Sequence, residues 1–179
     1  MRPSKRTEIL EAAVRVAARH GARGVTLEAV AAEAGVTRGG MTYHFHDREA
    51  LAVAIQHHLA DRWEQELVEA AGAPAADLSP RERVLAYAEV SMRAARPGEL
   101  QLVLNGAAEE LPINPWTDVV ARWTPDPSTA DQDPEVVRLL LVRMAADGIW
   151  SSELMGGGPL DPGLRVALAA AIRGLVESP

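Results

Sequence analysis

Two short helix signals separated by a single glycine, between Thr26 and Phe45, constrain the fold of this chain more than any other feature. Thr26 is a hydroxyl residue suited to an N-cap, and apolar residues follow it at helical spacing up to Gly35. Glycine at that position tolerates a positive φ, so the chain can turn sharply and Thr37 can cap a second helix. The segment therefore predicts a helix-turn-helix motif.

The second of these helices, from Arg38 to Phe45, contains two adjacent glycines. Each glycine costs roughly 1 kcal/mol of helix stability relative to alanine, so we expect these glycines to have a role other than stabilising the helix. Close approach of the backbone to a base edge or a phosphate is one such reason. The alternative is that Gly39 and Gly40 mark a loop and that the aromatic cluster starting at Tyr43 is ordinary core. The ordered succession of cap, helix, glycine turn and second cap favours the first interpretation.

This segment resembles the DNA-binding domain of the TetR family of transcriptional regulators. The family pattern reads V-[ST]-x-G-x-[LI]-Y-x-[HY]-F-x-[SDN]-[KR]-[ED]-x-L. The residues that fall on it are Val36, Thr37, Gly39, Met41, His44, Phe45, Asp47, Arg48, Glu49 and Leu51. One position departs from the pattern, because Thr42 stands where the family usually has tyrosine and the aromatic residue follows as Tyr43. The resemblance is strong over roughly the first fifty residues and weak beyond them.

The resemblance implies that the second helix enters a DNA major groove as a recognition helix. Its groove-facing residues would be Thr37, Arg38, Gly39, Thr42 and Tyr43. The phosphate contacts would come from Thr26, Tyr43, His44 and Arg48. The two-pronged guanidinium of Arg38 suits a guanine edge, and Thr26 stands at a helix N-terminus whose free N–H groups suit a phosphate. His44 is equally well explained as a structural histidine, and we expect Met41 and Phe45 in the core.

Charge is distributed unevenly along the chain, although the whole carries a net charge of −7 and has a pI near 5.2. Residues 1–50 hold eight lysines and arginines against six carboxylates, whereas residues 51–179 hold ten against nineteen. DNA affinity depends on local phosphate neutralisation, so this asymmetry points the N-terminal part toward DNA. Arg2, Lys5 and Arg6 form a basic arm that either contacts the DNA or is simply solvated.

Composition argues against several other classes of protein. The chain has no cysteine, which excludes disulfides, thiolate metal sites and cysteine nucleophiles. It has no signal stretch and no apolar run of about 18 residues, so we expect a cytoplasmic protein without a membrane partner. The adjacent His57 and His58 point about 100° apart on a helix, which is wrong for one metal ion. No catalytic motif occurs, so we expect no enzyme, no metal and no cofactor. The predominance of arginine over lysine is typical of a GC-rich bacterial genome.

Proline marks helix starts beyond Leu51. A capping residue directly precedes it four times, at Ser79-Pro80, Asn114-Pro115, Asp133-Pro134 and Asp161-Pro162. Helix-length segments lie at about 48–70, 80–95, 99–110, 115–124, 134–155 and 162–177. With three N-terminal helices, these predict an all-α fold of about nine helices. The expected domains are a helix-turn-helix domain over residues 1–46 and a helical-bundle domain over residues 47–179, which the resemblance assigns to effector binding and dimerisation.

The last two predicted helices are the candidate dimer interface. Residues 134–155 are apolar nearly all round, which requires burial on more than one side, and residues 162–177 are rich in alanine, which permits close helix approach. A two-fold, four-helix interface satisfies both and resembles how the family dimerises, although the two helices are also compatible with a monomer core. The interface candidates are Leu140, Met144, Leu168, Ile172 and Leu175. Two helix-turn-helix heads held one DNA turn apart would read a palindromic operator.

Aromatic and polar residues beyond the N-terminal domain are candidates for a small-molecule effector site, which the resemblance places among the C-terminal helices. The candidates are Trp63, Tyr87, Met92, Asn105, Glu109, Trp116, Trp123, Asp147 and Trp150. The aromatic and methionine candidates, taken singly, are better explained as core, and Glu109 is better explained as the cap of a solvated helix end. A carboxylate facing such a cavity would suit an amphipathic or cationic aromatic effector. The expected function is a homodimeric repressor of double-stranded operator DNA, and the alternative is a DNA-bound protein-interaction module without a small-molecule effector.

Overall fold

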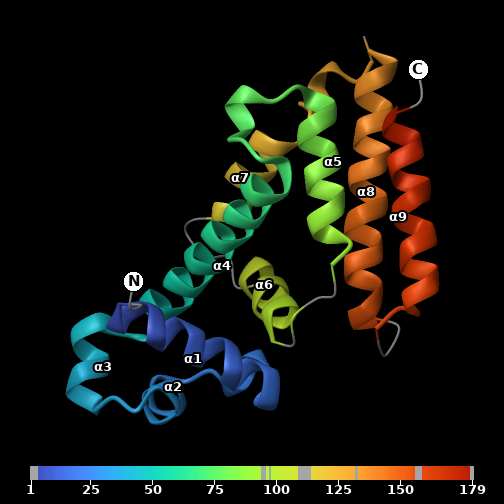
Figure 1. The fold of residues 1–179 in the computed structure, drawn as a ribbon. Helices are drawn as coiled ribbons and strands as arrows, with labels where there is room; N and C mark the ends of the chain where they lie inside the picture. The colour runs from blue at the N-terminus through green and yellow to red at the C-terminus, as the bar shows by residue number, and fades with distance from the viewer. Residues whose placement is uncertain are drawn as a thin grey trace. The chain divides into compact units, whose positions relative to one another are not determined.

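The computed structural model describes residues 4–93, 96, 98–108, 114–131, 133–155 and 159–177, and its regular structure within these ranges is entirely helical (Figure 1). The α-helices are α1 (Lys5–His20), α2 (Leu27–Ala34), α3 (Arg38–His44), α4 (Arg48–Ala71), α5 (Pro80–Ser91), α6 (Glu99–Ala108), α7 (Pro115–Trp123), α8 (Pro134–Met155) and α9 (Pro162–Glu177). Short 3-10 turns lie at Ala22–Gly24, Ala75–Asp77 and Pro127–Thr129. The all-α prediction is confirmed for this part of the chain. The largest difference in bounds is at α5, which ends at Ser91 rather than at residue 95.

The predicted caps set the starts of the helices. The hydroxyl oxygens of Thr26 and Thr37 each accept a main-chain N–H from three residues on, at 3.1 Å in both cases. Ser79 and Glu82 form a reciprocal capping box at the start of α5. The side chains before the other three prolines accept N–H groups from the first turns of α7, α8 and α9, at 3.2, 2.8 and 3.0 Å; they are Asn114, Asp133 and Asp161.

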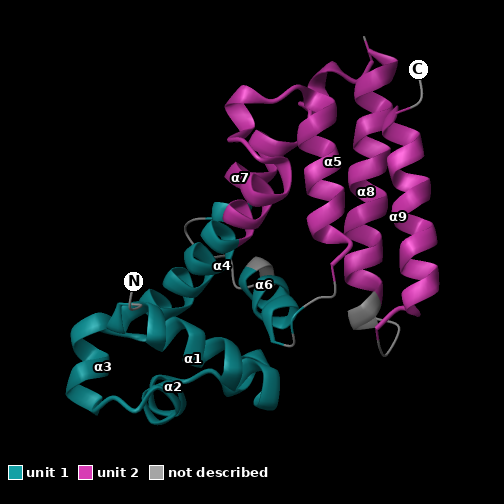
Figure 2. Cartoon of the chain, viewed as in Figure 1, with its two compact units in different colours: residues 1–62, 96–116 teal, residues 63–95, 117–179 magenta. Residues whose placement is uncertain are grey.

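The chain forms two compact units, which divide α4 between Arg62 and Trp63 (Figure 2). The first unit contains residues 1–62 and 96–116, and the second contains residues 63–95 and 117–179. The helix α6 therefore belongs with the N-terminal helices, although it follows α5 along the chain. The domain boundary predicted between residues 46 and 47 does not coincide with the division of these compact units. As a boundary between DNA-binding and effector-binding functions it stays a prediction.

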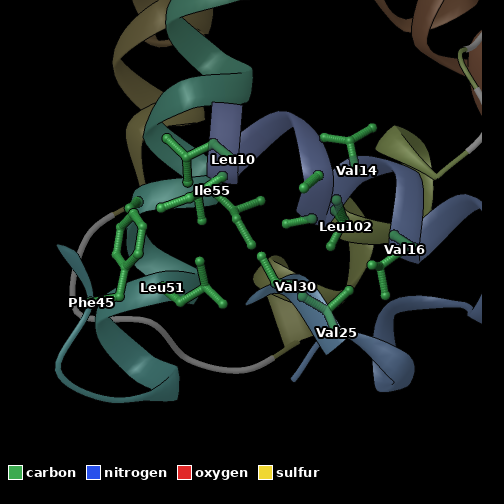
Figure 3. Close-up of a cluster of buried hydrophobic side chains, with 14 of the residues drawn as sticks. Leu10, Val14, Val16, Val25, Val30, Phe45, Leu51, Ile55 and Leu102 are labelled. Atoms are coloured by element: carbon green, nitrogen blue, oxygen red, sulfur yellow. The ribbon is translucent and has the colours of Figure 1, made fainter. Parts of the chain in front are cut away.

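One hydrophobic cluster forms the core of the first unit (Figure 3). Side chains from α1, α4 and α6 meet those of the helix-turn-helix segment there, among them Leu10, Val14, Val30, Phe45, Leu51, Ile55 and Leu102. Met41 and Phe45 are each 2 % exposed, so the expectation that they lie in the core is confirmed. Burying one such side chain contributes about 1.5–3 kcal/mol, which fixes the short α3 on its apolar side.

The helix α6 joins this unit through close packing and buried hydrogen bonds. Gly98 has φ +89°, and a Cβ there would lie 2.6 Å from the main chain of α1, so only glycine fits. The buried Gln56 of α4 donates to the Leu102 carbonyl at 2.9 Å and accepts the Trp116 indole N–H at 2.9 Å. A residue without this amide would leave both groups without the partner that now satisfies them.

Ion pairs also link α1, α4 and α6 within the first unit. Arg62 donates to Glu11 of α1 at 2.9 Å and also bonds Glu99 of α6, while His58 lies 2.8 Å from Glu11. Partial burial acts to raise the pKa of Glu11, but the hydrogen bond from His58 and the charge of Arg62 outweigh it and lower that pKa. These groups hold the α4 segment against its two neighbours.

In the second unit α5, α8 and α9 run side by side (Figure 1). Their shared interior contains Val84, Leu139, Val142, Ala146, Ile172 and Val176. Trp123, at the end of α7, is fully buried and its indole N–H donates to Glu64 at 3.3 Å. This unit thus has a core of its own.

Candidate functional site

The turn between α2 and α3 has the predicted geometry. Gly35 has φ +63° and ψ 36°, the left-handed conformation that ends α2, and its N–H returns to carbonyls of that helix. The N–H of Val36 bonds the Ala31 carbonyl at 3.0 Å, and Thr37 begins the next helix. A side chain other than glycine at position 35 would be strained, so this glycine sets the sharp reversal that presents α3.

The helix α3 has one buried and one exposed face. Met41 and the following Phe45 anchor it in the core. The five residues expected to face a DNA groove are all exposed: Thr37, Arg38, Gly39, Thr42 and Tyr43. Tyr43 is 86 % exposed, so its ring and hydroxyl are open to a partner. The structure therefore presents these residues together on one surface, and their contact with DNA stays a prediction.

The two adjacent glycines differ in their surroundings. A Cβ added at Gly39 would meet nothing within 4 Å, whereas one at Gly40 would lie 3.4 Å from Oγ1 of Thr37. Neither has a positive φ. No described atom of the chain thus requires glycine at position 39. A glycine at this position is therefore consistent with close approach of an external partner to the backbone.

The expected phosphate-binding residues lie around this surface. Thr26 is exposed at the N-terminus of α2 and Arg48 is exposed at the start of α4. His44 is half-buried and packs edge-on against Tyr43 with ring centroids 5.1 Å apart, so both interpretations of this histidine stay open. In the basic arm, Arg6 lies over the Phe45 ring at 5.3 Å, and Arg2 lies outside the described residues.

Three of the effector-site candidates come together inside the second unit. Trp63 packs edge-on against Tyr87 with ring centroids 5.1 Å apart, and the Tyr87 hydroxyl donates to Asp147 at 2.6 Å. Burial, and after it the negative charge of Asp147, raises the pKa of Tyr87 well above its ordinary value of 10.0, so the phenol stays protonated. The other carboxylate oxygen of Asp147 accepts from Nε of Arg143 at 3.1 Å.

Sequence reasoning missed Arg143, the cation of this cluster. Its position four residues before Asp147 on α8 is the spacing at which helix residues pair, so the signal was available. It also missed Gln56, because nothing local indicates that the partners of Gln56 come from α6 and α7. The cluster of Trp63, Tyr87, Arg143 and Asp147 is hereafter the aromatic-acid cluster.

The other effector-site candidates are scattered. Trp123 is fully buried, Met92 is 5 % exposed, and Trp150 is half-buried on α8. Asn105 and Trp116 belong to the first unit, where Trp116 bonds Gln56. Glu109 lies outside the described residues. The structure therefore gathers three of the nine candidates and leaves the role of each a prediction.

The dimer candidates divide by exposure. Leu140 and Ile172 are buried within the second unit of the single chain, and Leu168 is half-buried. Met144 and Leu175 are 58 % and 50 % exposed. Further exposed apolar residues on the same two helices were not among the candidates; they are Val137, Leu141, Leu164 and Val166.

The described residues form neither a metal-binding cluster nor a membrane-spanning helix. Among the described residues, no three histidine or carboxylate side chains gather as they would around a metal ion. None of the helices described is both long enough and apolar enough to span a bilayer.

Comparisons with known proteins match both parts of the chain. Residues 9–55 match the model of bacterial regulatory proteins of the tetR family, and residues 81–177 match the model of the tetracyclin repressor-like C-terminal domain. The HTH-type transcriptional regulator BetI of Rhizobium meliloti (strain 1021) is 30% identical over 174 residues, which cover 96% of this chain and 74% of that protein.

Solved structures agree with the fold. The multidrug binding protein EbrR complexed with malachite green has a TM-score of 0.65 and 25% identity, covering 98% of this chain and 100% of the other. A TetR-family transcriptional regulator from Rhodococcus sp. has a TM-score of 0.68 and 22% identity, covering 97% of each chain, and supports the fold alone.

Proposed function

Because the chain belongs to the TetR family of bacterial regulatory proteins and is thus a DNA-binding transcriptional regulator, we propose that it represses transcription as a homodimer on a palindromic operator and leaves the operator when a small effector binds. The observation that carries the proposal is the bare, polar face of α3 opposite its buried anchors Met41 and Phe45. A regulator of this kind acts where the chromosome is, in the cytoplasm.

The exposed face of α3 supplies the base-reading groups. Arg38 stands at the first position of the helix, where its guanidinium can donate two parallel hydrogen bonds to O6 and N7 of a guanine. Thr42 donates its hydroxyl to the Arg38 carbonyl at 3.0 Å, which leaves its methyl group free to contact a thymine methyl. Gly39 lets the backbone approach the base edges between them.

Phosphates would be held on both sides of α3. The N-terminus of α2 at Thr26 and the cation Arg48 at the start of α4 suit the two backbones of a groove. Tyr43, almost fully exposed, adds a phenol donor, and His44 adds a ring N–H if it turns outward. These contacts position the helix and contribute the salt-dependent part of the affinity.

Apolar stripes on α8 and α9 support dimerisation. On α8, Val137, Leu141 and Met144 are exposed at spacings of four and three, which place them on one helix face. On α9, Leu164 and Leu175 are exposed eleven residues apart, again on one face. Such stripes cost solubility in a monomer and suit a two-fold contact in which the same surface is buried on both chains.

The aromatic-acid cluster supports an effector that carries a positive charge on an aromatic or amphipathic body. Trp63 and the buried Tyr87 supply aromatic rings, and Asp147 supplies a carboxylate whose charge Arg143 now balances. A cationic effector would take the place of the Arg143 guanidinium at Asp147. Malachite green, a cationic aromatic dye, is bound by EbrR, which is 25% identical to this chain.

The effector would act through α4, because Trp63 belongs to the same continuous helix as Arg48. For release to occur, the effector must bind the DNA-incompatible conformation more tightly than the compatible one, since a ligand with equal affinity for both shifts nothing. Arg62, next to Trp63, anchors this helix to α1 and α6 of the first unit.

The test starts by sequencing genomic DNA fragments retained by the purified protein. A palindromic consensus is expected, and a fluorescent duplex carrying it should be bound by two chains. Adding malachite green should release the duplex from the wild type and not from an Asp147→Asn variant. Retained fragments without a common sequence would contradict the proposal, and release by no cationic or amphipathic compound would favour a protein-interaction module instead.

A further inference from the structure

A concave surface lies between α5 and α9, and none of the four residues of the aromatic-acid cluster lines it. Its apolar floor includes Leu85, Met92, Val166 and Ile172, and its volume is about 370 Å³. That volume lies within the ~300–1,000 Å³ typical of small-ligand sites. Val166 is 71 % exposed, which is unusual for a β-branched aliphatic side chain in a helix of a folded chain. We refer to this surface as the α5/α9 groove.

Three arginines line the α5/α9 groove, although residues 51–179 are strongly acidic as a whole. Arg165 donates to the Met92 carbonyl at 2.7 Å. Arg93 lies 3.4 Å from Glu89, the one carboxylate among the residues that line the groove, and 3.9 Å from Glu66, so its charge is balanced. The Arg173 side chain makes no hydrogen bond or ion pair with the described residues and is exposed to solvent.

We propose that the α5/α9 groove binds an amphipathic carboxylate, with the carboxylate paired to Arg173 and the alkyl or aryl body on the apolar floor. The Arg173 side chain has no carboxylate partner among the described residues, so an anionic head group is complementary to it and a cationic one is repelled. An arginine fork suits a carboxylate because two N–H groups can bond its two oxygens. The groove thus selects the charge opposite to that selected by Asp147 in the aromatic-acid cluster.

The groove is separate from the surface proposed for dimerisation. On α9, Val166 and Arg173 are seven residues apart and share one helix face, whereas Leu164 and Leu175 share another. Seven residues are close to two helical turns, and the two faces differ by well over 90° at 100° per residue. A second copy of the chain seated on the α8 and α9 stripes therefore need not cover this groove.

The experiment uses decanoate as the probe, with decanol and decyltrimethylammonium as neutral and cationic probes of equal chain length. Isothermal titration calorimetry on the full-length protein should give tightest binding for decanoate. In a methionine-methyl NMR spectrum, decanoate should shift the Met92 signal, because Met92 lines the groove. A shift confined to other methionines would overturn the proposal.

Arg173→Ala should weaken decanoate binding by about tenfold, the size expected for one charge-assisted pair, and should leave decanol binding unchanged. Arg23→Ala is the matched control, because it removes an exposed arginine from the first unit and changes the net charge equally. Neither change affects the core, so both variants should fold. Equal decanoate affinity in Arg173→Ala and Arg23→Ala would overturn the assignment.

Two further measurements test whether a second protein chain or a membrane surface occupies the groove instead. Val166→Ser should weaken decanoate binding and leave the oligomeric state unchanged by light scattering; loss of the dimer would show that the groove is a protein interface and overturn the proposal. Binding to phosphatidylglycerol vesicles that Arg173→Ala abolishes would assign the groove to a membrane surface and also overturn it. None of these outcomes depends on operator binding, so the groove can fail while the proposed function stands.

Discussion

Replacing Gly39 with alanine should change the stability of α3 and its affinity for DNA in opposite directions. The added Cβ meets nothing within 4 Å, and the residue has no positive φ, so alanine introduces no strain. Glycine costs a helix about 0.5–1 kcal/mol relative to alanine, and the substitution should recover about that amount. For a chain of this size the melting temperature should rise by roughly 1–4 °C.

The same methyl group should weaken operator binding, because it stands on the face through which the backbone approaches the bases. We expect a loss of about tenfold in a fluorescence-anisotropy titration, which corresponds to about 1.4 kcal/mol. Gly40→Ala is the matched control, since Gly40 is half-buried and its Cβ would lie at ordinary contact distance from Oγ1 of Thr37 and Cβ of Val36. It should stabilise the helix similarly and change operator affinity by less than about threefold.

Two results would refute this reasoning about α3. If Gly39→Ala and Gly40→Ala had the same operator affinity, the face that carries Gly39 would not lie against DNA. If Gly39→Ala lowered the melting temperature, the glycine would have an internal packing role that the geometry does not show.

Other substitutions test the remaining contacts. Arg38→Ala should cost roughly 1–3 kcal/mol of operator binding and relax sequence preference, and equal losses on operator and random DNA would refute a base-reading role. Arg48→Ala should weaken all sites alike and reduce the slope of log K against log salt by about 0.9, and an unchanged slope would exclude a phosphate contact. Asp147→Asn should lower the affinity for cationic dyes, measured by tryptophan quenching, but not for neutral ones. Hydrogen bonds from Arg122, at 2.7 and 2.6 Å, lower the pKa of Glu64 below its ordinary value of 4.5, so the stability from this pair is present above that pH and lost as the pH falls through the lowered pKa. Urea unfolding should therefore show a smaller loss of stability from pH 6 to pH 3 in Arg122→Ala than in the wild type, and equal losses would contradict the linkage.

The local elements of this fold could be predicted because their causes are local. Caps, the glycine turn and proline at the first helical position act within four residues, and the structure has each of them where the pattern places it. The division of α3 into a buried and an exposed face could be predicted from helical periodicity, since Met41 and Phe45 are four residues apart and share one face.

The long-range pairings could not be predicted in the same way. The contact of α6 with α1 depends on Gly98, which lies 80 to 84 residues further along the chain than the main-chain atoms of Val14 and Ala18 that it meets, and no local periodicity indicates it. The bond from Tyr87 to Asp147 joins residues 60 apart, so both were candidates but their pairing was not evident. Exposure also had to be observed, because Leu140 and Met144 are four residues apart on the same side of α8, yet Leu140 is 8 % exposed and Met144 is 58 % exposed.

The stoichiometry of the complex with DNA tests the central claim most directly. Native mass spectrometry of the purified chain with a duplex carrying the enriched palindrome should give two chains per duplex at low ionic strength. The Arg38→Ala variant should give markedly less of this complex at the same concentration. A single chain per duplex, or no complex with any enriched fragment, would contradict the account of α3 as a recognition helix presented twice by a symmetric dimer.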